Sequence, residues 1–283
     1  MRICPTIEEM RAASRSARHD ERTIGFIPTM GALHEGHLSL VRVARSRSDI
    51  VVVSIFVNPT QFGPGEDYTK YPRTFAQDSE QLQKAGVDFI FAPSPEDMYP
   101  QGATTWVDVA GVSERLDGRS RPGHFRGVTT VVSKLFHIVE PSFAFFGQKD
   151  AAQVAVIRRM VRDLNFPLQI VVCPIVREAD GLALSSRNIY LSPQERRSAL
   201  ALSRSLNAIR AQFQSGECNA ENLIEVGKQV INEDSRVRLD YLEIVDPETL
   251  EPISTINRPA LASVAAFVGT TRLIDNVLLY PAS

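Results

Sequence analysis

The chain has 283 residues, of which 43% are hydrophobic and 23% charged, and its formal net charge is −2. This length allows one large domain or two ordinary ones, and the composition is typical of a soluble globular protein. The small net charge gives no electrostatic footprint for nucleic acid, whereas a local cluster of cations could still bind a small anion.

Signals for export, membranes and disulfides are missing from the sequence. Cys4, Cys173 and Cys218 are odd in number and lack the spacing of metal ligands, which predicts free thiols in a reducing compartment. The first residues lack the apolar core of a signal peptide, and no apolar run approaches the length of a membrane span. We therefore expect a cytoplasmic protein with no membrane partner.

Helices and strands alternate along the first 176 residues. The apolar periodicity predicts helices over 6–19, 36–47, 74–85, 128–139 and 150–164. It predicts strands over 23–28, 49–57, 87–92, 104–109, 143–146 and 168–173. This alternation indicates an α/β fold with a doubly wound parallel sheet.

The pattern changes beyond residue 177. Two helices are expected at about 193–214 and 219–232, and three strands follow at 238–245, 262–268 and 272–279. Helices first and strands afterwards indicate a smaller α+β unit. We expect one domain over 1–176 and a C-terminal domain over 177–283.

Residues 28–38 read PTMGALHEGHL and lie between a predicted strand and a predicted helix. At such a junction in a parallel α/β sheet, backbone N–H groups and the helix dipole can bind an anion. His34 and His37 lie one helical turn apart on one face, where the two imidazoles could together neutralise a phosphate chain. Taken alone, the pair could equally be surface or metal-binding histidines.

Four polar segments, at 28–37, 58–63, 147–153 and 184–188, follow predicted strands or open loops. The carboxyl ends of parallel strands converge on one crevice, and clefts between domains are preferred ligand sites. The candidate phosphate partners are His34, His37, Lys149, Ser185, Ser186 and Arg187. The amides of Asn58, Gln61 and Gln153 suit a hydroxylated substrate. Singly, each residue is also compatible with an ordinary surface loop.

The stretches at 28–37, 58–62, 146–150 and 184–188, in this order and spacing, resemble the pantoate–β-alanine ligase family of the His-x-Gly-His nucleotidyltransferase superfamily. The resemblance covers nearly the whole chain and is densest over 23–191. It implies a Rossmann-like N-terminal domain, a smaller C-terminal lid domain, a homodimer, and the use of ATP with Mg²⁺. Gln148 departs from the family's usual Gly-Glu-Lys-Asp, and Ala151 and Ala152 stand where bulkier residues are common.

The reaction implied by this resemblance has two steps. The pantoate carboxylate attacks the α-phosphorus of ATP, giving pantoyl adenylate and pyrophosphate, and the amine of β-alanine then displaces AMP to give pantothenate. Neither step needs a protein nucleophile, so the protein supplies alignment and charge stabilisation. The implied catalytic residues are His37, as proton donor, and His34, Lys149 and Arg187.

The same resemblance assigns the binding residues. Gln61, Gln153 and Asn58 would hold the polar groups of pantoate, and Met30, Val131 and Val132 would pack its methyl groups. Asp150 would contact the ribose and the Val176 backbone the adenine, while Asp78 is a candidate magnesium ligand. The expected ATP-binding residues are Met30, Gly31, Ala32, Leu33, His34, Glu35, Gly36, His37, Gly147, Gln148, Lys149, Asp150, Val176, Leu184, Ser185, Ser186 and Arg187.

Other functions are compatible with parts of this pattern. A cytidylyltransferase that joins CTP to a phosphorylated alcohol would need a second anion site, whereas positions 58, 61 and 153 carry amides. A catalytically silent nucleotide-binding module would not need both histidines, the lysine and the Ser-Ser-Arg loop. A tRNA-charging role is disfavoured because no basic anticodon-binding region is present.

Overall fold

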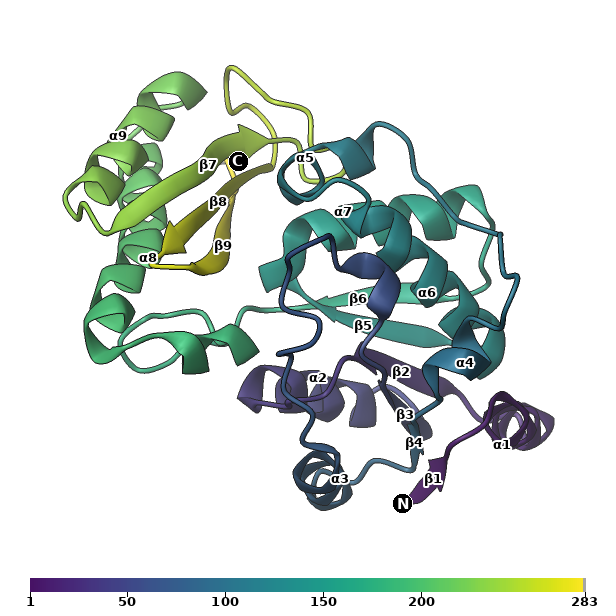
Figure 1. The fold of residues 1–283 in the computed structure, drawn as a ribbon. Helices are drawn as coiled ribbons and strands as arrows, with labels where there is room; N and C mark the ends of the chain where they lie inside the picture. Colours follow the sequence, from purple (N-terminus) through teal and green to yellow (C-terminus); the bar gives the residue numbers. More distant parts are fainter. Residues whose placement is uncertain (282–283) are drawn as a thin grey trace.

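The computed structural model describes residues 1–281 of the chain, which build two separate β-sheets (Figure 1). The larger sheet has six parallel strands in the order β1-β4-β3-β2-β5-β6, which confirms the predicted doubly wound sheet. Its strands are β1 (Arg2–Cys4), β2 (Ile24–Thr29), β3 (Ile50–Ile55), β4 (Phe89–Phe91), β5 (Phe143–Gly147) and β6 (Gln169–Cys173). The main helices around it are α1 (Ile7–His19), α2 (Glu35–Arg45), α3 (Phe75–Lys84), α6 (His124–Val139) and α7 (Ala151–Asp163).

Both faces of this sheet are apolar and covered by helices. Phe26 and Val52 pack into a core with α1, α6 and α7, whereas their neighbours Ile27 and Val53 pack against α2 and α3. Successive side chains of a strand point to opposite faces, so a strand covered on both sides needs an almost continuous apolar run. This explains the composition of residues 50–55.

The strand order reverses beside β2. From β2 the chain proceeds through β3 to β4 on one side, whereas β5 and β6 lie on the other side, and β5 pairs directly with β2. The loops that follow β2 and β5 therefore open a crevice at the topological switch point, which is where doubly wound sheets bind ligands. These two loops and the first helical turns after them carry His34, His37 and Lys149.

The smaller sheet is antiparallel and lies in the C-terminal region. It consists of β7 (Val237–Val245), β8 (Ala260–Val268) and β9 (Thr271–Leu279), which follow α8 (Pro193–Gln214) and α9 (Ala220–Asn232) as predicted. One face packs against α8 and α9, while Tyr241 and Leu261 on the other face join the core of the larger part (Figure 1). The domain boundary at 176/177 and the lid role of the second domain stay predictions.

The strand predicted at 104–109 is wrong. This segment is irregular and lies against α6, where the N–H of Val107 donates to Thr130 Oγ1 at 3.0 Å and the Thr129 hydroxyl donates to the Val107 carbonyl at 2.6 Å. Val107 and Val109 still pack into the core. The apolar residues of this segment are therefore buried against a helix whose threonines satisfy the backbone of the segment.

Short helical segments lie between the main helices and strands. They are α4 (Pro95–Met98), α5 (Asp117–Ser120), η1 (Pro59–Gln61), η2 (Val112–Glu114), η3 (Gln148–Asp150) and η4 (Ser186–Tyr190). Helix α6 begins at His124 rather than 128. The cysteines are free thiols, as predicted. Within residues 1–281, the helices are all too short or too polar to cross a lipid bilayer.

Candidate active site

The His-x-Gly-His loop is locked by its own backbone at the start of α2. The His34 ring accepts the Gly36 N–H at Nδ1 over 3.1 Å, and the His37 ring accepts the His34 N–H at Nδ1 over 3.3 Å. The two rings lie against each other with centroids 4.1 Å apart. Because each Nδ1 is an acceptor, a neutral ring must carry its proton on Nε2. The loop thus offers two Nε2–H donors side by side.

The electrostatics of the loop keep these rings neutral. Burial, with His34 and Lys149 nearby, lowers the pKa of His37 to about 3. Burial and Lys149 also lower the pKa of His34. In the ligand-free protein, the lowered pKa values favour uncharged imidazoles that donate hydrogen bonds, because charged rings would be desolvated beside a lysine. That the pair neutralises phosphate charge stays a prediction.

A buried carboxylate holds the turn that precedes the histidines. Gly31 and Ala32 both adopt positive φ angles, of 80° and 50°. Asp78 on α3 accepts the Ala32 and Leu33 N–H groups at 3.0 and 2.9 Å and the Thr74 hydroxyl at 3.1 Å. It is 1% exposed and uses both oxygens in these bonds. This geometry favours a positioning role for Asp78 over the magnesium role expected from the sequence.

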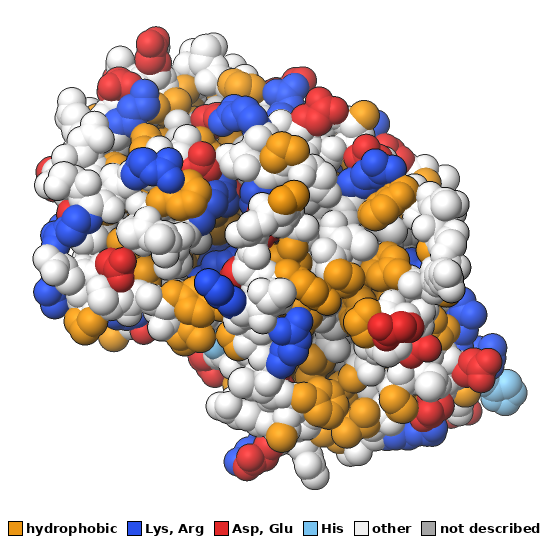
Figure 2. All heavy atoms as spheres, viewed as in Figure 1, with side chains coloured by type: hydrophobic (Ala, Val, Ile, Leu, Met, Phe, Trp, Pro, Cys, Tyr) orange, Lys and Arg blue, Asp and Glu red, His pale blue; other side chains and the backbone are white. Residues whose placement is uncertain are grey.

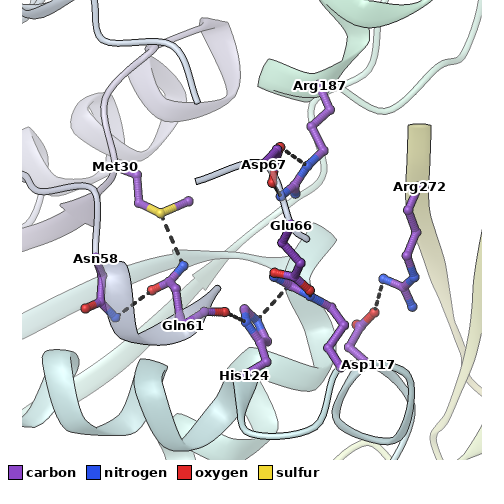
Figure 3. Close-up of polar contacts among 10 residues, drawn as sticks. Met30, Asn58, Gln61, Glu66, Asp67, Asp117, His124, Arg187 and Arg272 are labelled. Atoms are coloured by element: carbon purple, nitrogen blue, oxygen red, sulfur yellow. Dashed lines mark hydrogen bonds and ion pairs between the residues drawn. The ribbon is translucent and has the colours of Figure 1, made fainter. Parts of the chain in front are cut away.

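Two amide side chains, Asn58 and Gln61, link α6 to Met30, which follows β2 (Figure 3). Asn58, which is 1% exposed, donates to Gln61 Oε1 at 3.0 Å and to the Gly127 carbonyl at 3.2 Å. Gln61 donates in turn to Met30 Sδ at 3.2 Å. A Cβ at Gly127 would lie 2.3 Å from the Thr60 carbonyl oxygen, so glycine is what allows this approach. Asn58 is thus a buried support that orients Gln61.

Lys149 lies in η3, directly after β5. Its side chain is 20% exposed, and its Nζ is 3.7 Å from Asp150 Oδ1. Gln153, on the first turn of α7, lines the same space. The ammonium group is therefore next to the neutral histidines, as the lowered pKa values of both imidazoles reflect.

Another part of the site is lined by Arg187, whose guanidinium forms an ion pair with Asp67. Arg187 donates from Nε and Nη2 to the two oxygens of Asp67 at 3.1 and 3.0 Å (Figure 3). Burial alone would raise the pKa of Asp67, but the bonds and charge of Arg187 hold that pKa below its usual range. Ser185 Oγ accepts the Arg187 N–H at 3.3 Å, and Ser186 Oγ lies 3.3 Å from the Tyr71 hydroxyl. These contacts therefore fix residues 63–71 and the Ser-Ser-Arg loop relative to each other.

A second arginine repeats this arrangement. Arg121 binds both oxygens of Glu66 at 2.8 and 2.6 Å, and its Nη1 lies 3.0 Å from His124 Nε2. The His124 Nδ1 is 2.8 Å from the Gln61 carbonyl oxygen. Burial and Arg121 lower the pKa of His124 to about 4. Glu66, Asp67, Arg121 and His124 are site residues that the sequence did not predict, because none of them lies in one of the four polar segments.

Two adjoining cavities connect these groups. The inner one, of about 240 Å³, lies at the carboxyl ends of β2 and β5, and the outer one, of about 660 Å³, lies between residues 65–70, α5 and the C-terminal sheet. Lys149 and Arg187 line both. Figure 2 shows Lys and Arg side chains around the hollow between the C-terminal sheet and the larger part of the molecule.

Most of the residues predicted from the sequence meet in the inner cavity. Those lining it are Met30, His34, Gly36, His37, Asn58, Gln61, Val131, Val132, Gly147, Lys149, Asp150, Gln153, Val176, Leu184, Ser185, Ser186 and Arg187. The predicted ATP-binding residues that line neither cavity are Gly31, Ala32, Leu33, Glu35 and Gln148. They support the loops that carry the lining residues or, like Glu35, pair with a neighbouring side chain.

A doubly wound sheet with a His-x-Gly-His loop at its switch point, facing a lysine and an arginine, defines a nucleotide-binding α/β enzyme of the nucleotidyltransferase superfamily. Residues 2–278 match the family model described as pantoate-beta-alanine ligase. The chain belongs to this family, whose members are ATP-dependent ligases.

Individual relatives agree over their full lengths. The chain is 62% identical to the pantothenate synthetase of Acidobacterium capsulatum, over 99% of this chain and 97% of that protein. The crystal structure of pantothenate synthetase from Thermus thermophilus superposes with a TM-score of 0.95 at 50% identity, covering 99% of this chain and 100% of the other. The ligase from Francisella tularensis, complexed with beta-gamma ATP and β-alanine, superposes with a TM-score of 0.81 at 36% identity over 98% and 97% of the two chains.

Proposed function

We propose that the chain condenses (R)-pantoate with β-alanine to pantothenate through a pantoyl-adenylate intermediate, releasing pyrophosphate and AMP. The observation that carries the proposal is the inner cavity, where two neutral histidines face Lys149 and Arg187 beside an amide and aliphatic patch. The first group suits a triphosphate, and the patch suits a small branched hydroxy acid.

In the first step, pantoate lies between Met30, Gln61 and Gln153, with Val131 and Val132 against its methyl groups. Its carboxylate oxygen bonds to the α-phosphorus while the bond to the bridging oxygen breaks, and pyrophosphate leaves with the electron pair. Charge grows on the leaving oxygens, which Lys149 and Arg187 stabilise.

The histidines contribute hydrogen bonds to this step. His34 and His37 donate Nε2–H to phosphate oxygens, since each Nδ1 is an acceptor. The lowered pKa of His37 makes the neutral donor, rather than an imidazolium acid, the form present in the ligand-free protein near neutral pH. We therefore assign His37 a fixed hydrogen-bonding role in place of proton transfer.

In the second step, the neutral amine of β-alanine attacks the activated carbonyl. The C–N bond forms, the C–O bond to AMP breaks, and one amine proton is lost. The outer cavity adjoins the inner one at Lys149 and Arg187, which supports it as the route by which β-alanine arrives.

The family resemblance also implies Mg²⁺, a cytoplasmic location and a homodimer, and we retain these as proposals. Among residues 1–281, no group of three His, Cys, Asp or Glu side chains has the arrangement of a metal site. The metal-ligating side chains present therefore fit an ion that is bound mainly by the triphosphate. Asp150 is the carboxylate that lines the inner cavity. When bound, Mg²⁺ would offset part of the charge on the phosphates.

The test is isotope exchange between ATP and pyrophosphate in the absence of amine. Exchange that requires pantoate, but not β-alanine, supports the adenylate route. Exchange only with CTP would indicate a cytidylyltransferase, and no exchange with any acid would indicate a silent nucleotide-binding module. Either of these results would overturn the proposal.

A further inference from the structure

We propose that Asn276 on β9 is a positioning residue that fixes the backbone of Lys149. The C-terminal sheet thereby becomes part of the nucleotide site without touching the nucleotide. This inference rests on the proposed function only in that Lys149 faces the phosphates of ATP.

The Asn276 side chain is fully engaged with the loop after β5. It is 2% exposed, and its Nδ2 donates to the carbonyl oxygens of Gln148 and Lys149 at 2.9 Å each. Its Oδ1 accepts from Gln148 Nε2 at 3.1 Å. Both N–H groups and the oxygen of the amide thus have partners on two consecutive residues of η3.

This loop has no support of the same kind from its own neighbourhood. Neither η3 nor the start of α7 has a side-chain cap, in contrast to the capping boxes at the starts of α2 and α8. The carbonyls held by Asn276 lie 127 and 128 residues away in the chain. The position of the Lys149 backbone therefore depends on a tertiary contact.

The adjacent residue of β9 holds the opposite side of the site. Asp275, which is 3% exposed, binds Arg177 through both oxygens at 2.6 and 2.8 Å. Arg177 also donates to the Gly181 carbonyl at 3.1 Å, in the turn before the Ser-Ser-Arg loop. Two consecutive residues of one strand thus anchor both loops that bring positive charge to the cavity.

Neither Asn276 nor Gln148 lines the inner or the outer cavity. Asn276 therefore acts through Lys149. Its side-chain amide fixes the Lys149 backbone, and this backbone sets the position of the ammonium group. Gln148, the residue that departs from the family's usual glutamate, is a donor that complements the Asn276 oxygen. A shift of about 1 Å in a charged group at a reacting centre can lower the rate about a hundredfold, which sets the size of effect to expect.

The test compares Asn276→Ala with Leu279→Ala. Leu279 lies on the same strand, is 1% exposed and packs into the C-terminal core, so its truncation lowers stability without touching η3. Both variants are assayed below their melting temperatures for pantoate-dependent exchange and for binding of the β,γ-imido analogue of ATP by calorimetry. We expect Asn276→Ala to lose about a hundredfold in kcat/KM for ATP and at least tenfold in analogue affinity, with Leu279→Ala close to wild type.

A second variant tests the same contact by charge repulsion. Asn276→Asp keeps the shape but sets a carboxylate oxygen against two carbonyl oxygens, so it should weaken analogue binding at least as much. Equal affinities for the analogue in the Asn276 variants and Leu279→Ala would overturn the positioning role. Because analogue binding needs no pantoate, a wild-type protein that binds it without pantoate-dependent exchange would refute the proposed function alone.

Discussion

The inner cavity has a histidine wall, formed by His34 and His37, and an arginine wall, formed by Arg187, and the two walls are built in different ways. The histidine wall is formed within one loop, where neighbouring backbone N–H groups fix both rings and burial keeps them neutral. The arginine wall carries the charged guanidinium of Arg187, which is held by the carboxylate of Asp67, 120 residues away in the chain. The histidine wall thus offers directional hydrogen bonds, whereas the arginine wall offers positive charge to neutralise the phosphates.

The difference also concerns what a nucleotide must displace. The Nδ1 atoms of the histidines are already used internally, which leaves Nε2–H for the ligand without rearrangement. Arg187 instead has Asp67 bound in the fork geometry that a phosphate prefers. We therefore expect ATP to compete with Asp67 for Arg187 but not with any group for the histidines.

Removal of a histidine donor is the largest expected loss. His37→Ala should lower the rate of pantoate-dependent exchange about a hundredfold to a thousandfold, or about 3–4 kcal/mol, with the fold intact. His19→Ala provides the control, because its side chain on α1 is 91% exposed. Near-normal pyrophosphate release by His37→Ala would show that the histidine wall is not part of the chemistry.

On the arginine wall, Arg187→Lys keeps the charge but loses the planar fork. We expect kcat/KM for ATP to fall about thirtyfold, or about 2 kcal/mol, because a hydrogen bond to a charged group is worth about that much. Arg204→Lys, on the exposed side of α8, is the matched control. A variant as active as its control would mean that charge alone suffices at this wall.

The turn behind the histidine wall can be loosened through Asp78→Asn. The new NH₂ group must face one of the two backbone N–H groups that Asp78 now accepts, which should cost about 1.5 kcal/mol of unfolding free energy. Urea unfolding and the exchange assay should both respond. Glu80→Gln, on the exposed face of the same helix, should change neither. An unchanged Asp78→Asn variant would argue against the positioning role.

Low pH should reduce the free energy of unfolding, because the buried histidines resist protonation in the folded protein. The pKa of His37 is lowered to about 3 and that of His124 to about 4, both below the value of about 6.5 in an unfolded chain. Between these limits the unfolded chain binds more protons, so stability falls as the pH drops from about 6.5 towards 4. Each histidine contributes about 1.4 kcal/mol per pH unit in that window. His124→Asn should reduce the slope of unfolding free energy against pH, measured from pH 5 to 7, and an unchanged slope would contradict the assignment.

The sequence predicts what depends on local pattern. The apolar run of residues 50–55 identifies a strand buried on both faces, and the carboxyl-end rule brings His34 and Lys149 together although they lie in different loops. Strand β1 has only three residues and pairs with β4, which leaves too short a pattern to recognise. The segment at 104–109 fails because alternation also arises from packing against a helix.

The partners of the site residues depend on tertiary contacts and could not be predicted. Asp67 and Asn276 have no motif of their own, and each reaches its partner across more than a hundred residues. The sequence likewise cannot reveal that the pKa values of His34 and His37 are lowered, because the shifts depend on burial and on Lys149. The sequence identifies the site residues, whereas their charge states and their hydrogen-bond partners require the structure.

The charge state of the histidine wall can be measured directly by nitrogen-15 NMR of the imidazole rings, with His34→Asn and His37→Asn used for assignment. We predict that both rings are neutral at pH 7, carry their proton on Nε2, and that His37 does not titrate between pH 5 and 8. An imidazolium at pH 7, or a proton on Nδ1 of either ring, would contradict the division between a neutral donor wall and a cationic wall.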